Sequence, residues 1–236
     1  MARLLSLVAL LGTALAHEHH GTTLFPRSSS SDLPPPSFGY HGLSGPLNWH
    51  NLNRTTNSLC AKGTHQSPID LSPAHLASPS SASHSNSKPK FSVAPAPHGA
   101  DFLNLGTTVE VLYPNGTYTN AGKTSKLAQF HFHSPSEHSI DGVYYPLEVH
   151  FVFQAEQDAS LSVVGFLIDI SGGEGESGLE VNVGGKGDGK GGENERLLQV
   201  LAKSLGEIEG RGNETITAPL GFEGVERHFE REGVYQ

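Results

Sequence analysis

Three histidines in two short apolar runs are the residues of this sequence best suited to chemistry. His131 and His133 belong to the run QFHFH at 129–133, and His150 belongs to the run EVHFV at 148–152. Side chains on a β-strand alternate between its faces, so a strand over the first run places His131 and His133 on one face. If the two runs pair, the three imidazoles converge. Three neutral imidazoles with a fourth position open to water are typical of a catalytic zinc site, and we expect their nitrogens to lie within ~4 Å of one another.

Each run also carries a polar side chain two residues before a histidine on the same face. These residues are Gln129 and Glu148, and they are placed to accept hydrogen bonds that orient the zinc-binding rings. The alternative is a structural glycoprotein in which the histidines only pack and form hydrogen bonds within a sheet. Two histidine-bearing runs, each with a matched polar partner, favour zinc. A measurement of bound zinc separates the two interpretations.

Composition limits the classes of protein that this chain can be. Its 236 residues suffice for one sizeable core. Asp and Glu outnumber Lys and Arg by 24 to 15, which argues against a nucleic-acid-binding surface and favours a soluble protein or a small-molecule enzyme. The 28 Gly and 15 Pro residues are typical of β structure joined by many turns.

The first 16 residues have the features of a secretory signal peptide. Arg3 precedes an apolar run over 4–11, and Ala-Leu-Ala at 14–16 is a small-residue cleavage site. A membrane span needs ~20 apolar residues, and no segment of the sequence is that long and apolar. Three Asn-X-Thr acceptors for N-glycosylation begin at Asn53, Asn115 and Asn213. We therefore expect a secreted, extracellular glycoprotein without a membrane span.

The remaining chain is expected to form one domain behind a polar leader. Residues 17–36 are rich in His, Ser and Pro and predict a flexible leader, and the domain occupies 37–236. Two low-complexity segments interrupt it, one Ser-rich near 78–88 and one Gly-rich near 172–195. Neither can bury a core, so both are interpreted as loop insertions.

The periodicity of the apolar residues predicts a mainly β (α+β) domain. Strands are expected over 102–112, 127–133, 148–154 and 161–170, with a tight turn at Asn115-Gly116. An apolar stripe predicts one helix over 195–208. The predicted fold is a largely antiparallel twisted sheet with short covering helices.

The two histidine runs and several further motifs resemble the alpha-class carbonic anhydrases, in particular their secreted bacterial and fungal members. The spacing of 19 residues from His131 to His150 is similar to that of these members. The resemblance extends over residues 38–236 and is carried as well by Phe38-Gly39-Tyr40, Gly45-Pro46-Leu47-Asn48-Trp49, Cys60, Gly63, Gln66-Ser67-Pro68-Ile69, Ser136-Glu137-His138 and Val163-Val164-Gly165.

The resemblance implies zinc as cofactor and the reversible hydration of carbon dioxide to bicarbonate and a proton as activity. Zinc would be bound by the three histidines and supported by Gln129 and Glu148. The resemblance further implies a hydrogen-bond chain anchored by Glu137, a structural role for His138, a polar water network with Tyr40, and an apolar carbon dioxide pocket lined by Val152 and Val163.

Two departures from the family pattern bear on activity. Thr107 stands where many members carry a proton-shuttling histidine, and His65 or His98 could substitute. The family pattern also continues beyond Gln236 with a zinc-orienting Thr and a cysteine that would pair with Cys60. We therefore expect a longer natural product, no disulfide within this chain, and impaired hydration. A catalytically inactive zinc-binding domain that acts through a partner is the alternative.

Overall fold

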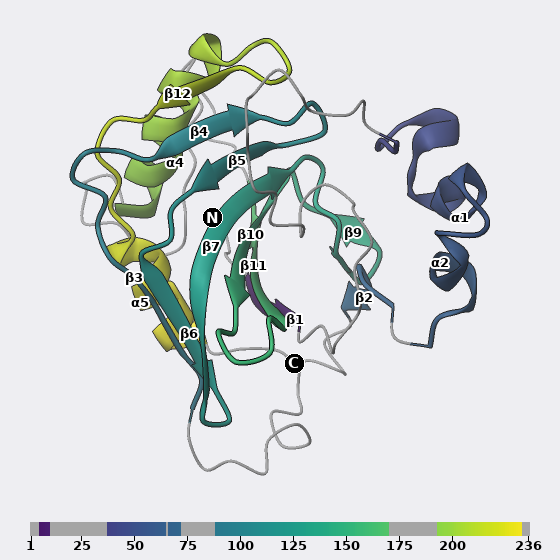
Figure 1. Cartoon of the computed structure of the whole chain (residues 1–236), viewed down its shortest axis with the longest axis horizontal. Helices are drawn as coiled ribbons and strands as arrows, with labels where there is room; N and C mark the ends of the chain where they lie inside the picture. The colour runs from purple at the N-terminus through teal and green to yellow at the C-terminus, as the bar shows by residue number, and fades with distance from the viewer. Residues whose placement is uncertain (1–4, 10–36, 65, 72–87, 170–192, 233–236) are drawn as a thin grey trace.

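A curved antiparallel sheet of nine strands forms the centre of this computed structural model, which describes residues 5–9, 37–64, 66–71, 88–169 and 193–232 (Figure 1). The strand order is β1-β11-β10-β7-β5-β4-β12, and β6 pairs with both β7 and β3. Its strands are β1 (Leu5–Ala9), β3 (Lys90–Val93), β4 (Asp101–Asn104), β5 (Val109–Leu112), β6 (Gly116–Asn120), β7 (Lys123–His133), β10 (Leu147–Gln154), β11 (Leu161–Ile168) and β12 (Glu214–Ile216).

Strands β7 and β10 pair in the register that brings the histidines together. His150 lies opposite His131, and Glu148 lies opposite His133. Phe130 and Phe151 are also directly opposite each other, one position further along, and therefore on the other face. A register slip of one residue would move the histidines to that face, so the burial of the phenylalanines fixes the position of the histidines.

The phenylalanine face of the sheet is the hydrophobic core. Phe130, Phe151 and Phe166 are at most 1 % exposed and their rings pack against one another or against Phe91. Burial of one such ring stabilises the fold by roughly 1.5–3 kcal/mol. The helices α4 (Glu193–Ser204) and α5 (Glu223–Glu232) cover this face with apolar side chains, namely Leu197, Leu201, Val225 and Phe229.

Several short elements lie on the side of the sheet away from α4 and α5, at the right in Figure 1. They are the turns of 3-10 helix η2 (Gly42–Ser44) and η3 (Pro46–Asn48), the helices α1 (Trp49–Leu52) and α2 (Ser58–Lys62), and a small three-stranded sheet of β2 (Asp70–Leu71), β8 (Ser139–Ile140) and β9 (Val143–Tyr144). A further 3-10 turn, η4 (Leu205–Glu207), follows α4.

The structure confirms the predicted fold class and corrects two details of it. Residues 102–112 are not one strand, because β4 and β5 form an antiparallel pair with a turn at Gly106, whose φ is 92°. The tight turn predicted at Asn115-Gly116 is wrong, since Gly116 begins β6. The turn lies instead at Ala121-Gly122, where both residues have positive φ. The predicted helix is present as α4 and η4.

Several predicted segments lie outside the described residues. They are the leader at 17–36, nearly all of the insertion near 78–88, and most of the insertion near 172–195. Of the expected signal peptide, the structure describes Leu5–Ala9, which forms β1 antiparallel to β11. No helix in the described ranges is long and apolar enough to cross a membrane. The signal peptide and secretion stay predictions.

Candidate metal centre

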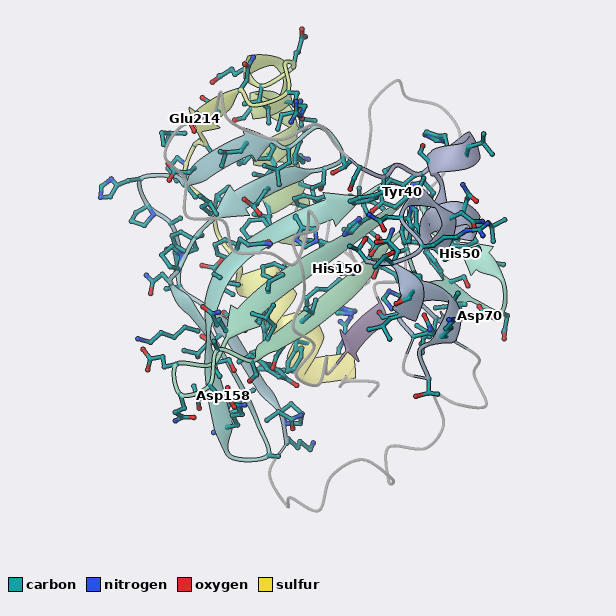
Figure 2. All side chains as sticks on the ribbon, turned by 45° about the vertical axis from the view of Figure 1, so that its right-hand side comes forward. Tyr40, His50, Asp70, His150, Asp158 and Glu214 are labelled. Carbon is teal, nitrogen blue, oxygen red and sulfur yellow. The ribbon has the colours of Figure 1, made fainter. Side chains whose placement is uncertain are left out.

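The three histidines meet on the sheet face opposite the core. His131 and His133 come from β7 and His150 comes from β10, and their exposed fractions are 1 %, 5 % and 7 %. One nitrogen of each ring lies within 4.8 Å of the corresponding nitrogens of the other two. This limit is slightly wider than the ~4 Å expected for ligands of one zinc ion. Figure 2 shows His150 on the strands that face the amino-terminal segment carrying Tyr40.

His131 and His150 are each held by an acceptor from their own strand. The Nδ1 atom of His131 lies 2.8 Å from the Oε1 atom of Gln129, and the Nε2 atom of His150 lies 2.6 Å from the Oε1 atom of Glu148. Since these oxygens accept, the ring nitrogens donate. In the neutral form of each ring, the lone pair is therefore on Nε2 of His131 and on Nδ1 of His150.

His133 is held by a residue that is distant in sequence. The hydroxyl of Tyr40 lies 2.7 Å from the Nδ1 atom of His133 and donates to the Oε1 atom of Glu137, also at 2.7 Å. A hydroxyl has one hydrogen, so the Nδ1 atom of His133 is the donor to the Tyr40 oxygen. The lone pair of His133 is therefore on Nε2.

These residues fit a zinc ion. The Nε2 atom of His133 is buried and has no hydrogen-bond partner in the described part of the chain, which is unfavourable unless a ligand occupies it. Zinc accepts neutral imidazole nitrogens, and the second nitrogen of each ring is anchored, as is usual for metal-binding histidines. A second possible group, His138 with Glu148 and His150, fits less well because its donors and acceptors already bond to one another.

Glu148 is fully buried and accepts four hydrogen bonds. Its Oε1 atom takes the side chains of His138 and His150, and its Oε2 atom takes the backbone N–H groups of Glu137 and His138 at 2.8 and 2.9 Å. Burial alone would raise the pKa of Glu148, but the hydrogen bonds from His138 and His150 lower it below its usual range. Glu148 is therefore an ionised acceptor in the interior, and the loop from β7 to β8 is tied to β10 through it.

The environment keeps two of the rings neutral. Burial, followed by the proximity of the other imidazoles, lowers the pKa of His131 well below its usual value. Burial also lowers the pKa of His133, to about 3. Burial acts in the same direction on His150, but its hydrogen bond to Glu148 outweighs burial and raises the pKa of His150. At neutral pH, His131 and His133 need lose no proton to bind a metal.

Val152 and Val163 lie beside the histidines. Val152 is two residues after His150 on the same face of β10, and Val163 lies opposite it on β11. Both are at most 4 % exposed, and neither belongs to the core cluster, which contains their neighbours Phe151 and Val164. They therefore place two buried apolar side chains on the histidine face of the sheet.

Of the residues predicted to matter for proton transfer and for disulfide formation, those that the structure describes are not in the histidine cluster. Thr107 is half-buried between β4 and β5, its hydroxyl having no partner among the described groups. His98 is exposed between β3 and β4, and His65 lies outside the described residues. Cys60, the one cysteine of the sequence, is exposed on α2, so no disulfide can form within the chain.

Glu110 is a residue that sequence reasoning missed. It lies opposite His131 in the pairing of β5 with β7, so it shares the histidine face, and it is 5 % exposed. Its neighbour Val111 is in the core cluster. The alternation of the 102–112 segment could have placed Glu110, but the sequence did not reveal that β5 is the next strand to β7.

Together, the curved antiparallel sheet and its three anchored imidazoles define a β protein with a histidine cluster that could hold a metal ion. Residues 44–180 match the family profile of eukaryotic-type carbonic anhydrase, so the chain belongs to this family. It is 37% identical over 126 residues to a carbonic anhydrase of Neisseria gonorrhoeae and 35% identical over 133 residues to one of Nostoc. These matches cover 52% and 56% of this chain but 46% and 48% of those proteins, so the chain spans about half the length of these relatives.

Solved structures agree with this assignment. The fungal alpha carbonic anhydrase of Aspergillus oryzae is 38% identical and superposes with a TM-score of 0.64. That match covers 84% of this chain and 73% of the fungal one. An alpha carbonic anhydrase of Thermovibrio ammonificans is 27% identical, with a TM-score of 0.55. It covers 79% of this chain and 70% of the other, so in both cases the shared region includes most of the residues described above.

Proposed function

We propose that this protein catalyses the reversible hydration of carbon dioxide to bicarbonate and a proton, with zinc held by His131, His133 and His150. One observation carries the proposal: the three buried rings each have a nitrogen within 4.8 Å of a nitrogen of the other two, and each ring has one nitrogen anchored by a hydrogen bond. Membership of the carbonic anhydrase family supports the same activity.

The residues around the histidines suit this reaction. Zinc at this position would supply a Lewis acid that lowers the pKa of water to ≈ 7, the value characteristic of carbonic anhydrases themselves. Val152 and Val163 offer carbon dioxide an apolar surface. Glu137, half-buried and bonded to Tyr40, is an acceptor that can orient a hydroxyl group beside the ligands. Preorganised acceptors and donors of this kind stabilise a transition state more than flexible ones do.

Stopped-flow hydration with a pH indicator tests the activity. The zinc-loaded chain is compared with His131→Ala, and zinc content is measured in both. The proposal is supported if the wild type hydrates carbon dioxide faster than buffer alone and the variant loses both its bound zinc and this activity. Full zinc occupancy without hydration favours instead an inactive zinc-binding domain that acts through a partner. If the wild type binds no zinc, the structural alternative, in which the histidines only pack, is favoured.

We also propose that hydration by these 236 residues is slow compared with that of other family members. Thr107 has no titratable group near neutrality at the position where many members carry a histidine. Proton transfer to solvent then depends on buffer. A hydration rate that rises with imidazole concentration supports this, whereas a fast rate independent of buffer contradicts it.

We further propose that the protein is secreted and glycosylated. The apolar run and cleavage site within residues 1–16 and three acceptor triplets support it, and Asn53, Asn115 and Asn213 are exposed. Expression in a eukaryotic host with its own leader tests both parts. The protein should appear in the medium and become lighter after glycosidase treatment. Retention in the cells at the mass of the full chain would contradict the proposal.

A further inference from the structure

The contact of Tyr40 with His133 joins two parts of the molecule that are separated by 93 positions in the sequence. Gln129 and Glu148 anchor their histidines from the same strand, two residues away. His133 has no such neighbour, because the corresponding position is occupied by His131 itself. Its anchor must therefore come from another element, and in the described part of the chain it comes from the segment before η2.

We propose that Tyr40 is a positioning residue for the metal, which sets the tautomer of His133 and couples zinc binding to the docking of the amino-terminal segment. The proposal rests on the zinc site of the proposed function. In this arrangement a hydroxyl group outside the sheet keeps the proton of His133 on Nδ1 and so leaves the lone pair on Nε2 for zinc.

The hydrogen-bond directions allow only one arrangement of protons around Tyr40. Its hydroxyl donates to Glu137 at 2.7 Å, so its oxygen must accept from the Nδ1 atom of His133, also at 2.7 Å. Burial, followed by the charge of Glu137, raises the pKa of Tyr40, so the hydroxyl keeps its proton at all ordinary pH values. Without this hydroxyl, the direct approach of His133 to Glu137 is 3.4 Å, which is long for a hydrogen bond.

Tyr40 is itself held by two aromatic neighbours, and we call Phe38, Tyr40 and Trp49 the aromatic unit. Their ring centroids lie 5.5 to 6.1 Å apart in edge-to-face geometry. The indole N–H of Trp49 donates to the carbonyls of Gly39 and Ser44, both at 3.0 Å, which closes the segment around the ring. These contacts link the Tyr40 ring to Trp49, so a shift of Tyr40 should change the surroundings of Trp49.

Trp49 makes the coupling measurable because it is the one tryptophan of the sequence. Its ring lies 5.8 Å from that of Tyr40, which lies 5.9 Å from that of His133. Zinc binding that orders His133 and Tyr40 should therefore change the emission of Trp49. The metal-free chain is titrated with zinc while Trp49 emission is followed, and the zinc Kd is obtained by competition with a chelator.

The decisive variant is Tyr40→Phe, which removes the hydroxyl and keeps the ring. We expect the zinc Kd to rise by ~10–100-fold, the usual effect of losing a partner of a metal ligand. The change of Trp49 emission on zinc binding should shrink in parallel. Tyr113→Phe is the matched control, since its hydroxyl donates to the carbonyl of Pro95 at 2.7 Å from another part of the sheet. It should leave the zinc Kd within ~2-fold of the wild type.

Metal-free stability separates positioning from a merely structural role. If Tyr40 only stabilised the fold, Tyr40→Phe would lower the melting temperature of the metal-free protein and leave the zinc Kd unchanged, and this result overturns the proposal. Hydrogen exchange of residues 38–49 in the wild type gives a test without any variant. Slower exchange with zinc is expected, and identical exchange with and without zinc also overturns it. A wild type that binds no zinc instead contradicts the proposed function.

Discussion

At the residue scale, Glu148 connects the metal ligands to the loop that carries Glu137 and His138. It accepts four hydrogen bonds, and the loss of any donor to a buried carboxylate is destabilising. Its charge also favours the tautomer of His150 that leaves Nδ1 free. We therefore expect Glu148 to affect both the fold and the zinc affinity, whereas Gln129 contacts His131 as a neutral acceptor.

We expect Glu148→Gln to weaken zinc binding by ~10–100-fold, because a neutral amide holds His150 less firmly and must turn its NH2 group toward two of the four donors. Competition with a chelator measures the zinc Kd. Glu156→Gln is the control, since Glu156 is an exposed carboxylate paired with Lys126. An unchanged Kd in Glu148→Gln would contradict a role for its charge.

The lowered pKa values of His131 and His133 predict a pH dependence of stability. Between pH 6 and pH 4 the unfolded chain binds a proton at each ring, while the folded metal-free chain does not, so the unfolded state gains stability as pH falls. The free energy of unfolding should fall by about 1.4 kcal/mol per pH unit for each histidine. Urea denaturation without metal measures it. The slope should be smaller in His133→Gln, and a flat profile in the wild type would show that the rings are not buried neutral.

At the element scale, β10 serves both faces of the sheet. Phe151 points into the core, where its ring contacts those of Phe91, Phe130 and Phe166, and His150 beside it points to the metal centre. Packing of the core residues therefore determines where the histidines lie along the strand and in which register they pair. A change on the core face is expected to reach the site through the strand itself.

Truncation of Phe151 to Ala should destabilise the protein by about 3–5 kcal/mol, because the ring is fully buried and leaves a cavity. Urea unfolding of the metal-free protein measures this change. Val143→Ala on β9 is the control, since Val143 is 62 % exposed and should change stability by less than about 0.5 kcal/mol. A loss below about 1 kcal/mol in Phe151→Ala would show that the core closes around the gap.

At the scale of the whole molecule, zinc should stabilise the fold, because its ligands come together only in the folded sheet. At a free zinc concentration of 100 times the Kd, the gain is ≈ 2.7 kcal/mol. Thermal unfolding with and without a chelator should show a higher melting temperature for the zinc form. His131→Ala should remove the difference, and an equal melting temperature in the wild type would contradict a preformed site.

Much of the site could be predicted from the sequence because its ligands follow strand periodicity. His131, His133 and His150 lie on one face for the same reason that their phenylalanine neighbours lie on the other. The partners of Glu148 in the Glu137–His138 loop could not be predicted, since they depend on backbone geometry. The place of Tyr40 could not be derived from periodicity either, because a contact across 93 positions leaves no local pattern.

The spacing of these contacts also bears on the order of folding. His131 and His150 are 19 residues apart and lie on adjacent antiparallel strands, so a short loop is enough to bring them together. The contact of Tyr40 with His133 closes a loop several times longer, and long loops close more slowly. During synthesis, the ribosome would therefore release an antiparallel strand pair that already carries the three histidines, and the amino-terminal segment, although made first, would dock onto it afterwards.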